Sequence, residues 1–223
     1  MSSRSQSRSL GAVRLLALSV PAVLLGWWFW GGSRASPSSY DEALDRALEP
    51  VLAGREIGSK LGAASPAQVR LVAREAAQSS FQYLAPRDLE LWQEIRSRVA
   101  RASPAACARL WQGGATDFFG PAVAALGDEP LRQYTEMLGR GLALRLERKP
   151  PPEPSPGALE RGLDAIASAQ PEAERARFRA DLRRRDLSDR RACQLFLGVS
   201  AGTERLEPAA RTDFLRALAK GLL

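Results

Sequence analysis

The chain has 223 residues, a formal net charge of +7 and no histidine. The absence of histidine excludes serine–histidine and cysteine–histidine nucleophiles, and it removes both the commonest general base and the commonest metal ligand. Residues 1–35 hold four of the 32 basic residues and none of the 25 acidic ones, so the remaining chain has 28 basic against 25 acidic residues, a net charge of +3. This near balance gives little reason to expect nucleic acid as a partner.

The first predicted element is an apolar segment, residues 15–33, which contains no charged side chain. At about 1.5 Å per residue, a helix of this length spans close to the roughly 30 Å of a bilayer core. Trp27, Trp28 and Trp30 lie at its far end, and indole rings favour the headgroup layer. The sequence therefore predicts a transmembrane signal-anchor in direct contact with the lipid bilayer.

The charges on either side of this segment predict its orientation. Residues 1–14 contain three arginines and no acid, so this basic tail is expected in the cytoplasm. The bias toward Ala, Arg, Leu, Gly and Pro is typical of a GC-rich bacterial genome, which places the anchor in the inner membrane and the rest of the chain in the periplasm. Two alternatives are a signal peptide cleaved near Ala35, which would release the domain into the periplasm, and a buried core helix.

The exported part is predicted to be all-α, with about eight to nine helices and two possible lobes. Residues 34–39 form a short polar linker, and residues 40–148 form the first lobe. Residues 149–157 include five prolines and form an extended connector. The second lobe, residues 158–223, is only 66 residues long and would be marginal alone, so we expect it to dock on the first.

Helix starts are marked by serine followed by proline at Ser65, Ser103 and Ser155. The helix that begins after Ser65 is expected to continue to Tyr83, because apolar residues recur at helical spacing along it. Another helix is expected from Tyr40 onward. Similar signals predict helices that begin near Pro86, Pro121, Asp128, Pro171, Ser188 and Pro208.

The only two cysteines are Cys107 and Cys193, and an even pair in an oxidising compartment permits one intramolecular disulfide. This bond would cross the proline-rich connector and lock the two lobes together. The alternative is a pair of buried free thiols that pack as small apolar residues.

Residues 172–191 contain eight arginines and five acids. Arg183, Arg184 and Arg185 are candidate contacts for an anion or an acidic partner. The alternative is a solvated helix face with ion pairs from Glu172 to Arg175, Asp181 to Arg185 and Asp186 to Arg190.

Two further side-chain groups are candidates for chemistry. Glu75, Glu90 and Glu94 are the carboxylates considered for cleavage of an envelope glycan, although acids on helices beside arginines are usually solvated. The second group consists of five aromatic side chains. They would line a groove for a ligand or partner helix, or else belong to the core. This set is Trp92, Trp111, Phe118, Phe119 and Tyr134.

The sequence contains no recognisable catalytic motif and implies no cofactor or metal. The function expected from an anchor followed by a packed helical domain is non-catalytic binding or scaffolding in the bacterial envelope, with an envelope protein, an assembly or an incoming toxin as partner. The alternatives are a carboxylate-dependent envelope glycan hydrolase and a helical carrier of an apolar ligand.

Overall fold

The computed structural model describes residues 37–54, 56–63, 65–113, 118–147, 150–184 and 186–221. The predicted anchor, residues 15–33 with Trp27, Trp28 and Trp30, lies outside the described residues, as does the basic tail 1–14. Within the described ranges, no helix combines the length and the apolar character needed to cross a bilayer.

The described residues confirm the all-α prediction, because they form eleven α-helices, one 3-10 helix and no strand. The number exceeds the expected eight to nine because short helices such as the five-residue α3 do not show a periodic pattern. The helices are α2 (Pro37–Leu52), α3 (Ile57–Leu61), α4 (Pro66–Gln78), η1 (Phe81–Tyr83), α5 (Pro86–Ala102), α6 (Pro104–Gln112), α7 (Phe119–Ala124), α8 (Asp128–Leu146), α9 (Ala158–Ser168), α10 (Glu172–Leu182), α11 (Asp189–Thr203) and α12 (Pro208–Ala219).

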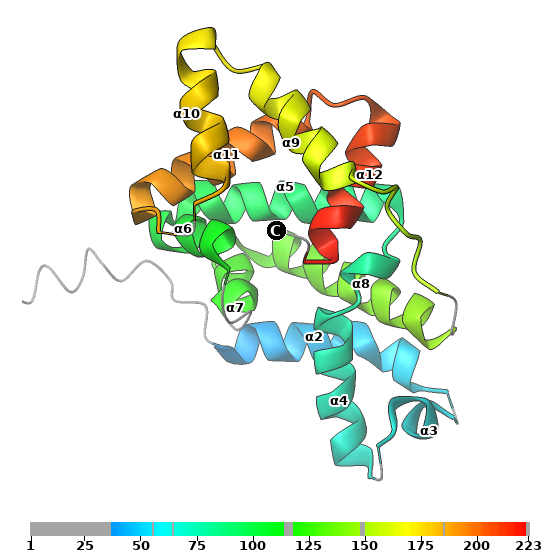
Figure 1. The fold of residues 1–223 in the computed structure, drawn as a ribbon. Coiled ribbons are helices and arrows are strands. Elements are labelled where there is room, and N and C mark those ends of the chain that lie inside the picture. Colours follow the sequence, from blue (N-terminus) through cyan, green and yellow to red (C-terminus); the bar gives the residue numbers. More distant parts are fainter. Residues whose placement is uncertain are drawn as a thin grey trace, which may run out of the picture. The chain divides into compact units, whose positions relative to one another are not determined.

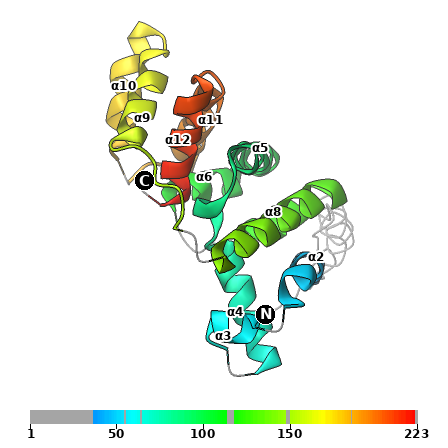
Figure 2. The same ribbon diagram turned by 90° about the vertical axis from the view of Figure 1, so that its right-hand side faces the viewer.

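Residues 35–223 form one compact unit, and α5 runs through its middle. Figures 1 and 2 show α2, α4 and α8 on one side of α5 and α9 to α12 on the other. The helix α2 packs along α8, α11 packs along α6, and α12 contacts both α9 and α5. The core between these layers contains fully buried side chains that include Leu89, Ile95, Leu138, Phe214 and Leu215.

Two of the three serine–proline helix starts are confirmed. The Ser65 hydroxyl accepts a hydrogen bond from the Gln68 amide at 3.3 Å, and that of Ser103 accepts one from the Ala106 amide at 3.2 Å. The prediction at Ser155 is wrong, because α9 begins at Ala158 after Gly157, which has a φ of 71°. The Ser155 hydroxyl instead donates to the Asp213 carboxylate on α12, so a tertiary contact replaces the cap.

Two predicted helix boundaries also differ. The helix α4 ends at Gln78 and does not reach Tyr83. At this end the Ser79 hydroxyl donates to the Glu75 carbonyl at 3.1 Å, and that of Ser80 donates to the Ala77 carbonyl at 2.6 Å, bonds that compete with helix continuation. The helix α2 begins at Pro37, so residues 37–39 of the expected linker are helical.

The predicted disulfide is confirmed. Cys107 on α6 and Cys193 on α11 are bonded, with their Cα atoms 4.9 Å apart and 86 residues apart in sequence. Cys107 is fully buried against Phe196 and Ala100. The bond therefore joins α11, from the C-terminal part of the chain, to the central helices.

An ion pair joins α2 to α4. Arg74 donates from Nε and Nη2 to both carboxylate oxygens of Asp45, at 2.7 and 2.6 Å. This contact holds the pKa of Asp45 below its usual value. Because that pKa is lowered in the folded protein, the stabilisation is fully present above the unfolded-state pKa of about 3.9 and is lost as the pH falls through the folded-state value.

We expect Asp45→Asn to lower the free energy of unfolding by at most about 1 kcal/mol at pH 7, because both side chains are about one-third exposed. The difference between wild type and variant should shrink as the pH falls below about 4. Urea unfolding at pH 7 and pH 3 measures both effects. The exposed Glu49→Gln on the same helix is the matched control, and an equal loss in that variant would contradict the ion-pair explanation.

Candidate functional site

Side chains from α2, α4, η1, α5, α6 and α8, together with Phe118 and Phe119 at the start of α7, surround a pocket of about 180 Å³. Its lining combines six aromatic rings with two arginines, and the backbone of Gly113 closes one edge. The lining side chains are Tyr40, Gln78, Phe81, Trp92, Arg96, Arg109, Leu110, Phe118, Phe119 and Tyr134.

Local sequence features place these groups together. Trp92 and Arg96 are four residues apart on α5 and therefore lie on the same helix face. Tyr40 on α2 lies flat against Gly120 of α7, where a Cβ atom would overlap the tyrosine ring. Glycine at position 120 thus allows α2 to approach closely enough for Tyr40 to form part of the wall.

Arg96 is the central polar group of the pocket. Its guanidinium lies 4.4 Å from the centre of the Trp92 ring and 5.1 Å from that of Phe196 on α11. Its Nη1 donates to Gln93 Oε1 at 3.3 Å, and its Nη2 donates to the Leu110 carbonyl at 3.4 Å. Both bonds are longer than the usual 2.7–3.2 Å, so the protein holds this guanidinium by weak hydrogen bonds.

An acid partner for the charge of Arg96 is missing from the described residues, which do not include Asp117. Among the residues that the structure describes, no carboxylate forms an ion pair with this guanidinium. Burial lowers the pKa of Arg96 to about 10, which leaves the group charged at neutral pH. The pocket therefore contains a half-buried cation with no acid partner among the described residues, and such a cation favours an incoming anion.

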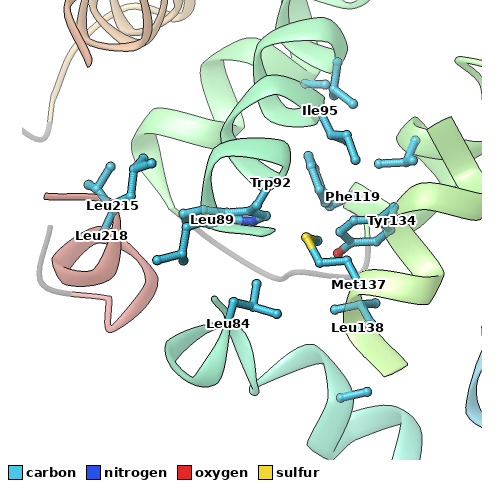
Figure 3. Close-up of a cluster of buried hydrophobic side chains, with 14 of the residues drawn as sticks. Leu84, Leu89, Trp92, Ile95, Phe119, Tyr134, Met137, Leu138, Leu215 and Leu218 are labelled. Atoms are coloured by element: carbon cyan, nitrogen blue, oxygen red, sulfur yellow. The ribbon is translucent and has the colours of Figure 1, made fainter. Parts of the chain in front are cut away.

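The aromatic rings form the remaining walls. Phe119 meets Tyr134 edge to face with ring centres 5.3 Å apart, and Phe81 lies 5.3 Å from Trp92. Figure 3 shows Phe119 and Tyr134 gathered on one side of Trp92, with Leu89 on the other side. Such tilted and edge-to-face contacts are the preferred arrangement of aromatic rings, so the walls are well packed around the opening.

Two tyrosine hydroxyls in the lining also titrate. Burial raises the pKa of Tyr134 well above its usual value, and it also raises that of Tyr40, whose hydroxyl accepts a hydrogen bond from Gln78 Nε2 at 3.4 Å. Both hydroxyls are therefore protonated at neutral pH and remain hydrogen-bond donors.

Arg109 on α6 supplies a second cation at the rim. Its side chain is exposed, and its guanidinium lies 5.6 Å from the centre of the Phe118 ring. The pocket thus has one half-buried and one solvent-exposed positive charge.

The five aromatic residues singled out in the sequence were considered as the lining of one groove, and four of them meet in the structure. Trp92, Phe118, Phe119 and Tyr134 line the pocket, whereas Trp111 packs beside the cluster of Ala100, Cys107 and Phe196. Trp92, Phe119 and Tyr134 are also buried, so these rings belong to the core and to the pocket wall together. Sequence reasoning missed Arg96 and Arg109, although the four-residue spacing of Trp92 and Arg96 was a usable signal.

The predicted arginine cluster lies elsewhere. Arg183 and Arg184 are exposed between α10 and α11, and Arg185 is outside the described residues. Of the expected helix-face pairs, Glu172 and Arg175 both lie on α10, and the pair of Asp181 with Arg185 lies outside the described residues. Asp186 and Arg190 do not share a helix, because α11 begins at Asp189. The Asp181 carboxylate instead accepts from Arg191 Nε at 2.6 Å, and Asp186 pairs with Arg184 at 3.0 Å.

The three candidate catalytic carboxylates do not line the aromatic pocket. Glu75, Glu90 and Glu94 are all exposed, and Glu90 pairs with Arg211 of α12 at 3.4 Å. In the part of the chain that the structure describes, no group of three or more potential ligands is placed to hold a metal ion.

The chain was compared with protein-family models, with curated proteins and with solved structures, and none of these comparisons found a match.

Proposed function

We propose that this chain is a non-catalytic binding protein of the bacterial envelope, which engages a partner protein through the aromatic pocket around Arg96. Residues 15–33 anchor it in the inner membrane, and the helical domain faces the periplasm. The observation that carries the proposal is the half-buried guanidinium of Arg96 in an aromatic pocket, where no acid of the described residues pairs with it. A partly desolvated charge without an acid partner is costly, and an anionic group of a partner would compensate it.

The size of the pocket favours a single inserted group over a whole ligand. Sites for drug-sized molecules usually measure about 300–1,000 Å³, whereas this pocket measures about 180 Å³. A lipid would not fit, but one bulky side chain or chain end of a partner would. Binding interfaces commonly rely on a few such anchoring groups, which fill pockets in the opposite surface.

The disulfide supports export of the domain. Structural disulfides persist in oxidising compartments, including the bacterial periplasm, and are rare in the cytosol. The Cys107–Cys193 bond agrees with an N-terminal segment that carries the domain across the inner membrane.

In-cell photocrosslinking tests this function. The photoreactive residue benzoylphenylalanine replaces Phe118, a partly buried residue of the pocket, and in a matched control it replaces Leu71, which is 68% exposed on α4. We expect discrete protein adducts of the full-length chain from position 118 that are absent from position 71. No adduct at position 118, or the same adducts at both positions, would contradict partner binding through this pocket.

A further inference from the structure

We infer that the group received by this pocket is a single carboxylate carried on a phenyl-sized apolar body. This inference deepens the proposed function and rests on it. Two properties of the pocket lead to it: the charge and donor geometry at Arg96, and the size and aromatic character of the walls.

The polar end of the pocket fits a monoanion. A guanidinium forms two parallel hydrogen bonds with a carboxylate, and in a partly dry site these charge-assisted bonds are roughly twice as strong as neutral ones. One face of the Arg96 guanidinium lies on the Trp92 ring, and this contact fixes the plane of its N–H donors. Its existing hydrogen bonds of 3.3 and 3.4 Å are long. A carboxylate would replace these weak interactions with strong ones.

A phosphate dianion fits less well. Arg96 is the less exposed of the two cations in the described lining, because it is half-buried and Arg109 lies at the exposed rim. The other polar groups are the Tyr40 and Tyr134 hydroxyls and the Gln78 amide, which supply hydrogen bonds but no charge. A second negative charge would therefore remain uncompensated in an apolar site, which is costly.

The apolar end of the pocket fits an aromatic ring. The space is surrounded by the ring faces and edges of Phe81, Trp92, Phe119 and Tyr134. About 180 Å³ remains between these rings and the two arginines. An inserted ring would make the offset and edge-to-face contacts that these side chains already make with one another. A ring and its carboxylate together then occupy both ends of the pocket.

This chemistry has two possible sources, a polypeptide that ends in an aromatic residue and a free aromatic acid. Four probes separate the sources and the charge requirement: 3-phenylpropionate, its uncharged amide, phenyl phosphate, and the peptide acetyl-Gly-Gly-Phe with a free carboxylate. Each is titrated into the full-length protein in detergent, and binding is followed by ligand-detected NMR.

We expect 3-phenylpropionate to bind at least about tenfold tighter than the amide, because a charged hydrogen-bonded pair replaces a neutral one. The carboxylate should also bind more tightly than phenyl phosphate. Tighter binding of the peptide than of 3-phenylpropionate assigns a polypeptide terminus as the source. Binding of the free acid alone assigns a small molecule and would contradict a partner protein as the occupant of the pocket.

Variants locate the binding in the pocket. Arg96→Gln should abolish the preference for carboxylate over amide, and Arg96→Lys should retain only part of it, because lysine lacks the fork. Arg101→Met, an exposed residue on the same helix, is the matched control and should bind as the wild type does. Arg109→Gln, at an exposed position where folding is not threatened, should weaken carboxylate binding a few-fold.

Equal binding of acid and amide, tighter binding of phenyl phosphate, or an unchanged preference in Arg96→Gln would overturn the carboxylate assignment. If adducts at position 118 persist in that case, partner binding stands and only the chemical class of the occupant is wrong. If those adducts are also absent, the proposed function fails as well.

Discussion

Replacing both Cys107 and Cys193 with alanine should lower the free energy of unfolding by about 4.5 kcal/mol. The disulfide closes a loop of 86 residues, and the chain-entropy relation gives a penalty of this size for such a loop in the unfolded state. The melting temperature should fall by about 10–15 °C, since 1 kcal/mol corresponds to roughly 2–4 °C in domains of this length. Urea and thermal unfolding of the wild type and the double variant measure the loss.

Reduction provides the control for this experiment. Adding a reductant should destabilise the wild type toward the level of the double variant and leave the variant unchanged. Two reactive thiols in the unfolded, unreduced wild type, or a loss below about 1 kcal/mol, would contradict the structural role of the bond. Because the bond joins α6, which carries Arg109, to α11, which carries Phe196, the double variant should also bind carboxylate probes less tightly.

Replacing Phe214 with alanine should cost about 3–5 kcal/mol of stability, the usual range for truncating a fully buried phenylalanine. The Phe214 ring on α12 is fully buried and lies directly on Gly162 of α9. Truncation therefore leaves a cavity at the junction where α12 contacts α9 and α5. Urea unfolding measures the effect, and the exposed Leu71→Ala is the control, with an expected change within about 0.5 kcal/mol.

A double-variant cycle tests whether the Phe214 and Gly162 contact is responsible. Gly162→Ala alone should cost about 1–3 kcal/mol, because its Cβ would overlap the Phe214 ring. The smaller Phe214→Leu side chain should accept the new methyl group, so the two changes together should cost less than their sum. Strict additivity, or a loss below about 1 kcal/mol for Phe214→Ala, would show that this junction is not a rigid part of the core.

Several fold features were predictable because their causes are local. The cap and proline at Ser65 and Ser103 act through neighbouring backbone groups, so the sequence alone locates these helix starts. Ser155 has the same pattern but forms its contact with Asp213 on α12, 58 residues away. No local rule includes such a partner, and the expected helix start was therefore two residues too early.

The pocket was only half predictable for a similar reason. The aromatic residues stood out by type, and four of the five candidates meet in one place. The spacing of Trp92 and Arg96 was a weak signal, because a helix carries many arginines and only tertiary packing distinguishes a half-buried one from an exposed one. Its partners Leu110 and Phe196 come from α6 and α11, and the disulfide that holds these two helices together was the only sequence signal for that arrangement.

The most direct measurement of ligand entry beside Arg96 is a fluorine NMR titration of the full-length protein labelled with 5-fluorotryptophan. The chain contains five tryptophans, of which Trp92 alone lines the pocket among the residues that the structure describes. Adding 3-phenylpropionate should shift the Trp92 resonance, assigned by Trp92→Phe, more than any other tryptophan signal, and the amide should have little effect at the same concentration. An unmoved Trp92 resonance at saturating ligand, or equal shifts with acid and amide, would contradict a carboxylate-binding pocket.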